Sequence, residues 1–328
     1  MTQDVPVTEA DTRASFVLAD VGGTNVRFAV LAGSEFRGIE HLSVVDFPQF
    51  NDALAAFLSR RTDLGPIRYA LFGVAGVVEG GRCTLTNSAW TVDADEVRSR
   101  FGFANVHLVN DFEAVAWALP HFGSNELRKL GGGQPKIGAP MLALGPGTGL
   151  GVAAYVPRGQ SGFVLRTEAG HTTLPSSSAR EDAILGILRK RYGHVSAERV
   201  LSGHGLENLY QAIATLDTLN VPPRSAAEIT KMGLSSGCAA SSAAIDAFCA
   251  ILGEVAGNLA LAVGAQGGVF IAGGIALHLR DYLPQSQFRA RFEAKGRMSS
   301  YVTPIPVFLI LHADPAFVGL RVLAARHV

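Results

Sequence analysis

The sequence has few cysteines and no excess of charge of either sign. Its 328 residues include only Cys83, Cys238 and Cys249, which are far apart and form no CxxC pair. This spacing argues against a disulfide framework or a structural zinc site and favours a reducing, cytoplasmic location. Lys plus Arg and Asp plus Glu both total 28, and no long basic stripe occurs. Neither nucleic acid nor a membrane surface is therefore an expected partner, and a small molecule is favoured.

Long apolar runs are also absent. No such run reaches about 18 residues, the length that a membrane-spanning helix needs. Residues 1–15 are polar and acidic and lack the apolar core of a signal peptide. We expect these residues to form a flexible N-terminal extension. The remaining length suits one large domain or two medium ones.

Glycine is plentiful, and two glycine-rich turns stand out. Asp20-Val-Gly-Gly-Thr-Asn-Val-Arg27 and Gly145-Pro-Gly-Thr-Gly-Leu-Gly151 each lie between two apolar runs of strand length. Each pattern predicts two strands joined by a tight turn. Glycine amides can approach an anion closely, and an acidic residue at a strand end can hold a metal ion. A nucleotide phosphate with Mg²⁺ is therefore the expected ligand, and an ordinary hairpin is the alternative.

Neither turn has the sequence of a better-known phosphate loop. No Gly-Lys-Ser/Thr follows the glycines, and a strand rather than a helix comes next, which excludes the P-loop. The third glycine of the dinucleotide fingerprint is replaced by Leu150, or by Val152 if counting starts at Gly147.

Apolar periodicity predicts an alternation of strands and helices. The predicted strands are 16–19, 28–31, 68–72, 106–109, 141–144, 152–156, 163–166, 269–272 and 305–311. The predicted helices are 51–61 with Asn51 or Asp52 as its cap, 112–119, 179–192, 206–219, 242–263, 275–280 and 315–326. The last helix is expected to return to the first lobe. We therefore predict a small α/β domain of residues 16–121 plus 312–328 and a large α/β domain of residues 122–311.

Six motifs follow one another in a fixed order. They are Asp20-x-Gly-Gly-Thr-x-x-Arg27, Asn110-Asp111-Phe, Gly145-x-Gly-Thr-Gly-Leu-Gly151, Glu168-x-x-His171, Glu198-Arg-x-Leu-Ser-Gly203 and Gly273-Gly274. Together they resemble the bacterial ATP-dependent glucokinase family of the hexokinase, actin and Hsp70-like ATPase superfamily, from Phe16 to the end of the chain. The resemblance implies a two-lobe ribonuclease H-like or actin-like α/β fold with a duplicated mixed-sheet core and a cleft between lobes. It also implies phosphorylation of D-glucose by ATP to glucose 6-phosphate, the first step of glycolysis.

Asp111 is the candidate catalytic residue. It follows a predicted strand, where ligands gather in open α/β sheets, and a carboxylate there can accept the proton of an attacking sugar hydroxyl. The resemblance implies the same role. Asp111 directly before a helix could instead be its N-cap. Asn110 is interpreted as a turn residue or a partner of a sugar hydroxyl, and Glu113 is a weaker candidate for the base.

Glu168, His171 and Glu198 are the remaining candidate sugar ligands. Vicinal hydroxyls donate well to carboxylates, and a histidine can donate or accept, so these side chains suit a sugar. The resemblance implies that they bind the hexose. A metal site shared by Glu168 and His171 is the alternative. A related kinase group, the repressor and open-reading-frame kinase family, pairs a similar histidine with a cysteine-rich zinc loop, but no CxCGxxGC segment occurs here.

The nucleotide residues are drawn from three glycine-containing segments. They are Asp20, Gly22, Gly23, Thr24, Asn25, Gly147, Thr148, Gly149, Gly273 and Gly274. The two turns are expected to hold the phosphates, and the last glycine pair resembles glycines that contact adenosine, although it could be an ordinary bend. The resemblance places Asp20 near Mg²⁺, through water. Arg27 is interpreted as a structural ion pair or a charge on the face of a strand.

Two alternatives to a glucose kinase stay open. One is a regulator of the same superfamily that binds nucleotide or sugar without turnover. Such relatives carry a DNA-binding helix-turn-helix, for which too few residues precede Phe16. The other is a kinase for mannose, fructose or glucosamine. The resemblance also favours a homodimer, and His204 has no predicted role.

Overall fold

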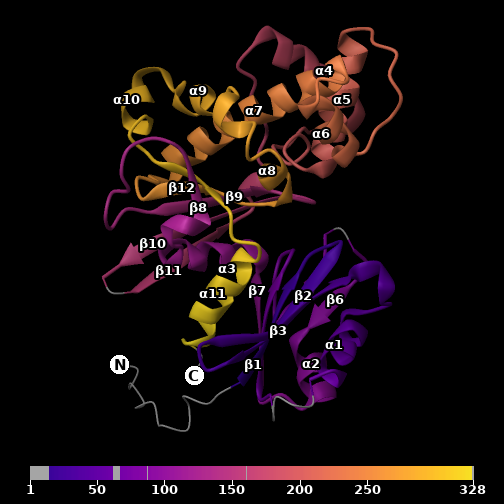
Figure 1. The fold of residues 1–328 in the computed structure, drawn as a ribbon, viewed down its shortest axis with the longest axis vertical. Helices are drawn as coiled ribbons and strands as arrows, with labels where there is room; N and C mark the ends of the chain where they lie inside the picture. Colours follow the sequence, from indigo (N-terminus) through magenta and orange to yellow (C-terminus); the bar gives the residue numbers. More distant parts are fainter. Residues whose placement is uncertain (1–14, 62–66, 87, 160, 327–328) are drawn as a thin grey trace. The chain divides into compact units, whose positions relative to one another are not determined.

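The computed structural model is shown in Figure 1. It describes residues 15–61, 67–86, 88–159 and 161–326, so the predicted extension lies outside the described residues except for Ser15. The chain divides into two compact units. The first contains the residues up to His121 and those from Ala313 onward, and the second is Phe122–His312. The assignment of these two units as separate domains stays a prediction.

The first unit contains a five-stranded sheet with the order β3-β2-β1-β4-β7. Its strands are β1 (Ser15–Val21), β2 (Asn25–Ala32), β3 (Glu35–Ser43), β4 (Tyr69–Val74) and β7 (Asn105–Asn110). β1 is antiparallel to β2 and parallel to β4, which is parallel to β7. The central strands are almost entirely apolar because helices cover both faces of the sheet.

Helices lie on both sides of this sheet (Figure 1). They are α1 (Phe50–Ser59), α2 (Ala94–Phe101), α3 (Asp111–Ala118) and α11 (Pro315–Ala324), and a small sheet is formed by β5 (Arg82–Thr84) and β6 (Thr91–Asp93). α11 packs on α3 so closely that a Cβ at Gly319 would lie 1.7 Å from the carbonyl oxygen of Ala114. The predicted return of the final helix to the first lobe is therefore confirmed.

The strand register places two candidate residues at one end of this sheet. Asp20 on β1 pairs with Gly73 on β4, and Val74 pairs with Asn110 on β7. The three strands are parallel, so their carboxyl ends lie at the same end of the sheet. Neighbouring strands are about 4.8 Å apart, which puts the ends of β1 and β7 roughly 10 Å apart. Asp20 and Asp111 therefore lie at the same end of one sheet, where the carboxyl ends of its parallel strands meet.

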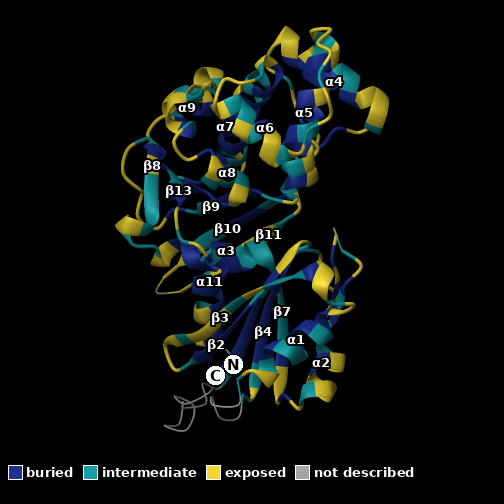
Figure 2. Ribbon diagram, turned by 45° about the vertical axis from the view of Figure 1, so that its right-hand side comes forward, coloured by how far each residue is buried: buried dark blue, intermediate teal, exposed yellow. Residues whose placement is uncertain are grey.

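The second unit has a six-stranded mixed sheet with the order β11-β10-β9-β12-β13-β8. Its strands are β8 (Leu127–Gly131), β9 (Met141–Pro146), β10 (Leu150–Arg158), β11 (Ser161–Thr167), β12 (Gly268–Ile271) and β13 (Val307–Ile310). Its helices are α4 (Ala179–Tyr192), α5 (Gly203–Leu216), α6 (Ala226–Leu234), α7 (Ala239–Val263), α8 (Gly274–His278), α9 (Phe288–Glu293) and α10 (Ser299–Val302). Figure 2 shows buried strands and helices with exposed outer faces, as expected for one core between sheet and helices.

Helix α7 is the longest helix, as predicted. By length and composition it could cross a membrane, yet 72% of its most apolar window is buried inside the protein. Phe248 and Leu252 on this helix are fully buried in the core of the second unit. Asp246 and Glu254 interrupt the apolar residues of this helix, so it contains no uninterrupted apolar run of membrane-spanning length.

Several elements differ from the predictions. β3, α2, β8, α6 and α9 were not predicted. The N-cap of α1 is Gln49, so the predicted caps Asn51 and Asp52 are wrong. Asn51 lies inside the helix and is buried, and its side-chain amide donates to Glu96 on α2 at 2.5 Å. A polar residue near a helix start therefore bonds to another helix here instead of capping its own.

Candidate active site

The first glycine turn joins β1 to β2. The N–H of Gly22 donates to the carbonyl oxygen of Asn25 at 3.0 Å, and the N–H of Val44 donates to Thr24 at 3.0 Å. The N–H groups of Gly23 and Thr24 have no acceptor within the described part of the chain. A turn that leaves two neighbouring amides without acceptors can bind an anion. The predicted turn is confirmed, whereas its ligand stays a prediction.

Asp20, at the end of β1, takes part in an ion-pair cluster. Its Oδ2 accepts from Nη1 of Arg27 at 2.7 Å, and Nε of Arg27 lies 3.2 Å from Oδ1 of Asp314. His41 lies 3.6 Å from the same oxygen of Asp314. Burial raises the pKa of the Asp20 carboxyl above its ordinary value, and the Arg27 guanidinium opposes this shift. The interpretation of Arg27 as a structural ion pair is confirmed.

Asn110, not Asp111, caps helix α3. Its Oδ1 accepts from the N–H groups of Phe112 at 2.9 Å and Glu113 at 3.2 Å, and its Nδ2 donates to Gly76 at 3.1 Å. The reading of Asp111 as the N-cap is therefore wrong. Asp111 is the first residue of the helix, and its Oδ1 accepts from the N–H of Phe112 at 2.9 Å. The N-cap hydrogen bonds of α3 are therefore made by Asn110 and do not require the carboxylate of Asp111.

The second glycine turn joins β9 to β10 in the second unit. The N–H of Gly147 donates to the carbonyl oxygen of Gly149 at 2.8 Å. The N–H groups of Thr148 and Gly149, like those of the first turn, have no acceptor among the residues that the structure describes. The late glycine pair lies against this turn, because a Cβ at Gly273 would lie 2.3 Å from the carbonyl oxygen of Pro146. With a φ of +91°, Gly273 also occupies a backbone region that suits glycine.

Glu168, His171 and Glu198 lie together. A single 3₁₀ turn, Ala169–His171, follows Glu168. Nε2 of His171 lies 3.8 Å from Glu168 and its Nδ1 lies 3.9 Å from Glu198. The prediction that Glu168 and His171 face one space is consistent with this arrangement, and Glu198 joins them from a distant segment. No group of three His, Cys, Asp or Glu side chains that could hold a metal occurs in the described ranges.

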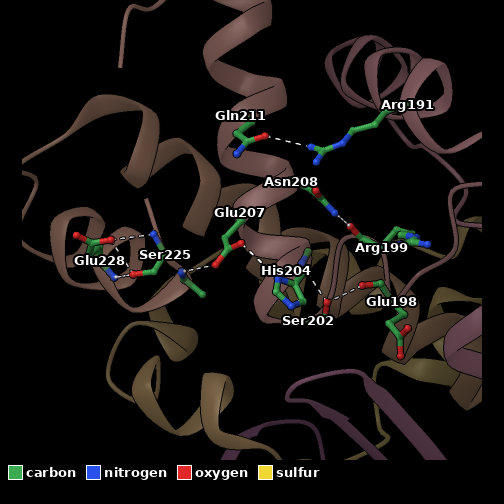
Figure 3. Close-up of polar contacts among 12 residues, drawn as sticks. Arg191, Glu198, Arg199, Ser202, His204, Glu207, Asn208, Gln211, Ser225 and Glu228 are labelled. Atoms are coloured by element: carbon green, nitrogen blue, oxygen red, sulfur yellow. Dashed lines mark hydrogen bonds and ion pairs between the residues drawn. The ribbon is translucent and has the colours of Figure 1, made fainter. Parts of the chain in front are cut away.

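Glu198 also contacts the second glycine turn, which the sequence did not predict. The N–H of Leu150 donates to its Oε2 at 2.9 Å, and a Cβ at Gly149 would lie 2.4 Å from the same oxygen. Figure 3 shows the carboxylate directed away from helix α5, while Ser202 donates to the backbone carbonyl of Glu198. Only the tertiary structure reveals this contact, because 48 residues separate Leu150 from Glu198.

His204 lies in the first turn of α5 (Figure 3). Its Nδ1 is 3.4 Å from Oε2 of Glu207, and its side chain is 79% exposed. Glu207 also accepts from the N–H of Ala226 at 3.0 Å. His204 therefore has a surface ion-pair partner when protonated, and we assign it no role in the candidate site.

Comparison with known proteins adds independent findings. The family model described as Glucokinase matches residues 17–327. The chain is 44% identical over 307 residues to a glucokinase of Paramagnetospirillum magneticum, covering 93% of this chain and 95% of the relative. It superimposes on the crystal structure of a glucokinase from an Antarctic psychrotroph with a TM-score of 0.82 and 35% identity, covering 95% of this chain and 98% of that one.

A more distant structure agrees in fold alone. It is a ROK family glucokinase from Streptomyces griseus in complex with glucose and AMPPNP, with a TM-score of 0.65 and 19% identity. The likeness covers 95% of this chain and 100% of that one. The predicted actin-like α/β fold is confirmed by these structures together. The resemblance inferred from the six motifs is also confirmed, and the chain belongs to the Glucokinase family.

Proposed function

We propose that the protein transfers the γ-phosphoryl group of ATP to the 6-hydroxyl of D-glucose, with Asp111 as the general base. The observation that carries this proposal is the family membership over residues 17–327, together with 44% identity to a glucokinase. The reaction forms glucose 6-phosphate and ADP. Positioning and charge neutralisation supply most of the catalysis in such a transfer.

The position of Asp111 in the chain supports its assignment as the general base. Asp111 begins α3 directly after β7, at the end of the sheet where β1 also ends and where Asp20 is the penultimate residue of β1. A carboxylate there takes the proton of the sugar hydroxyl as its oxygen attacks phosphorus. Glu113 is inside the first turn of α3 and ranks below Asp111. The Oδ1 of Asn110 caps α3 and its Nδ2 donates to Gly76, so only the remaining capacity of this amide would be available to a sugar hydroxyl.

The nucleotide phosphates would bind to the amides of both glycine turns. Gly22, Gly23, Thr24 and Asn25 form the first set, and Gly147, Thr148 and Gly149 form the second. Four of these N–H groups, those of Gly23, Thr24, Thr148 and Gly149, have no acceptor in the described chain, which supports the assignment. Gly273 and Gly274 lie next to the second turn and would contact adenosine.

Mg²⁺ is the proposed metal, and Asp20 is its proposed ligand. The Asp20 side chain is 14% exposed, and one of its oxygens is already bonded to Arg27. Such a carboxylate suits an ion that keeps much of its water and takes its other ligands from phosphates. The bound ion would neutralise phosphate charge. The role of this chain's own residues would be to hold the Asp20 carboxylate in place through Arg27.

The sugar ligands would be Glu168, His171 and Glu198. Their side chains are 60%, 52% and 26% exposed, so all three are accessible to a solute. The two carboxylates would accept hydrogen bonds from vicinal hydroxyls, and either ring nitrogen of His171 would donate or accept according to its tautomer.

We propose a cytoplasmic homodimer. The three cysteines are free thiols, which suits a reducing compartment. Phe163 and Leu165 on the edge strand β11 are 48% and 46% exposed and offer an apolar surface to a second copy. Light scattering coupled to size exclusion tests the assembly, and a monomer at working concentration would contradict it.

The decisive experiment is a hexose panel with ATP, in which ADP formation and sugar phosphate are both measured. The proposal expects the highest kcat/KM for D-glucose and little turnover without sugar. A higher kcat/KM for mannose, fructose or glucosamine would change the substrate. Binding of ATP and glucose without phosphoryl transfer would instead establish a regulator.

A further inference from the structure

The carboxylate of Glu198 lies between two parts of the second unit that have different ligands in the proposed reaction. One oxygen is bonded to the second glycine turn, and the other faces the loop of Glu168 and His171. We propose that Glu198 couples the two sites, so that glucose binding strengthens ATP binding and ATP strengthens glucose binding. This inference rests on the proposed function and adds a role that a simple sugar ligand would not have.

The contact with the turn involves side chain and backbone. Oε2 accepts from the N–H of Leu150 at 2.9 Å, and it would lie 2.4 Å from a Cβ of Gly149. The carbonyl oxygen of Glu198 accepts from Ser202, the N-cap of α5. The next residue, Gly203, donates its N–H to Gly147 at 2.9 Å. Glu198 is therefore held to the turn by its own carboxylate and by the start of α5, where Figure 3 shows the bond from Ser202 to the carbonyl of Glu198.

The contact with the sugar loop is equally direct. The N–H of Glu198 donates to the carbonyl oxygen of Gly170 at 2.9 Å, and Oε1 lies 3.9 Å from Nδ1 of His171. Gly170 in turn packs on the first residue of β10, because a Cβ there would lie 2.2 Å from the carbonyl oxygen of Leu150. A movement of Glu198 would therefore affect the loop and the turn together.

The charge of Glu198 gives the coupling a sign. An ionised carboxylate next to the amides of Thr148 and Gly149 repels the phosphates that those amides would bind. A sugar hydroxyl that donates to Oε1 disperses this negative charge and weakens the repulsion. Bound glucose should therefore raise the affinity for ATP, and thermodynamic reciprocity requires the same factor in the other direction.

Glu168 provides a matched control. It is also a proposed carboxylate ligand of the sugar, but it is 60% exposed, and its side chain has no hydrogen bond to the turn within the described residues. Substitution of Glu168 by Gln should affect the sugar only. In Glu198→Gln the side-chain oxygen can still accept from Leu150, so the variant removes the charge and keeps the geometry.

The test is calorimetric titration of the full chain with AMPPNP and Mg²⁺, with and without glucose. For the unaltered protein we expect glucose to raise the affinity for AMPPNP about fivefold or more, the lower part of the usual range for coupled sites. In Glu198→Gln the affinity without glucose should rise by a similar factor, and the effect of glucose should largely disappear. In Glu168→Gln the affinity without glucose should be unchanged.

Two results would overturn the coupling. One is an absence of any glucose effect on AMPPNP binding in the unaltered protein. The other is a Glu198→Gln variant whose affinity for AMPPNP without glucose equals that of the unaltered protein. Either result leaves the proposed function intact if glucose and AMPPNP both bind. A failure of the unaltered protein to bind glucose at all would refute the proposed function itself.

Discussion

Arg27 donates to Asp20 at 2.7 Å, and the same guanidinium lies 3.2 Å from Asp314 at the start of helix α11. One cation thus holds two carboxylates that are 14% and 12% exposed. Through this cation the proposed magnesium ligand on β1 is fixed to the C-terminal segment of the same unit. This cluster therefore joins the end of β1 to the start of α11, which lie almost 300 positions apart in sequence.

Arg27→Met should destabilise the protein because it leaves Asp20 and Asp314 close together without their shared cation. We expect a loss of about 2 kcal/mol, below the value for a fully buried pair because Arg27 is 34% exposed. Urea unfolding followed by circular dichroism measures the change in midpoint. Arg37→Met is the control, since Arg37 lies 3.8 Å from Glu35 and both are exposed. An equal shift in both variants would show that the cluster does not stabilise the fold.

Asp111→Asn should lower kcat by about two to four orders of magnitude, the usual contribution of a general base. Glucose affinity and the unfolding midpoint should change little, because Asn110 caps α3. Steady-state kinetics and calorimetry give the two quantities separately. Near-normal turnover in this variant would exclude Asp111 as the base. Glu113→Gln is the control, and a larger loss of kcat there would transfer the role to Glu113.

Gly319→Ala should disrupt the packing of α11 on α3. The added Cβ would lie 1.7 Å from the backbone oxygen of Ala114, so the helices would have to separate. We expect a loss of about 3 kcal/mol, the upper end of the usual cost of overpacking. Gly186→Ala in α4 is the control, because no atom lies within 4 Å of its Cβ position. That variant should gain about 0.5 to 1 kcal/mol from helix propensity. Equal midpoints for the two variants would contradict the packing argument.

Acid should weaken a buried ion-pair cluster in the second unit. Arg291 donates to both oxygens of Glu181, at 2.7 and 3.1 Å, and also to Glu254. Burial alone would raise the pKa of Glu181, but the hydrogen bonds from Arg291 and Ser177 lower it below its ordinary value. A lowered carboxyl pKa stabilises the fold above the unfolded-state pKa, and this stability is lost as the pH falls through the folded-state pKa.

Arg291→Met should therefore cost about 3 to 5 kcal/mol at neutral pH, because two carboxylates lose their cation. The loss should shrink as the pH falls and the carboxylates become protonated. Thermal unfolding at a series of pH values checks both statements. A difference between variant and unaltered protein that stays constant down to acid pH would rule out the electrostatic explanation.

The two glycine turns and the position of Asp111 could be predicted because their signals are local. Glycines between two apolar runs specify a hairpin, and a polar pair after an apolar run marks a strand end. Strand β3 was not predicted because none of its residues is buried and its apolar residues Phe36, Ile39 and Leu42 occur at every third position, so they show no apolar alternation. The identity of the α3 cap could not be decided from sequence because Asn110 and Asp111 are both good capping residues.

The contacts of Glu198 and Arg27 could not be predicted from local sequence patterns. Both residues belong to motifs that the sequence identified, and Arg27 was correctly interpreted as an ion pair. The partners Leu150 and Asp314 are distant in sequence and are ordinary residue types, so no spacing rule selects them. They become neighbours only when sheet register and helix packing are fixed.

Gly149→Ala offers a separate test of the contact between Glu198 and the second turn. Its Cβ would lie 2.4 Å from Oε2 of Glu198, and the flexible side chain would move aside and lose its bond to Leu150. Stability should change little, whereas KM for glucose should rise about tenfold, the effect expected from loss of a charged hydrogen bond. At Gly147 a Cβ would meet no atom within 4 Å. Gly147→Ala should therefore leave KM for glucose unchanged, and an equal rise in both variants would assign the effect to the turn backbone instead of Glu198.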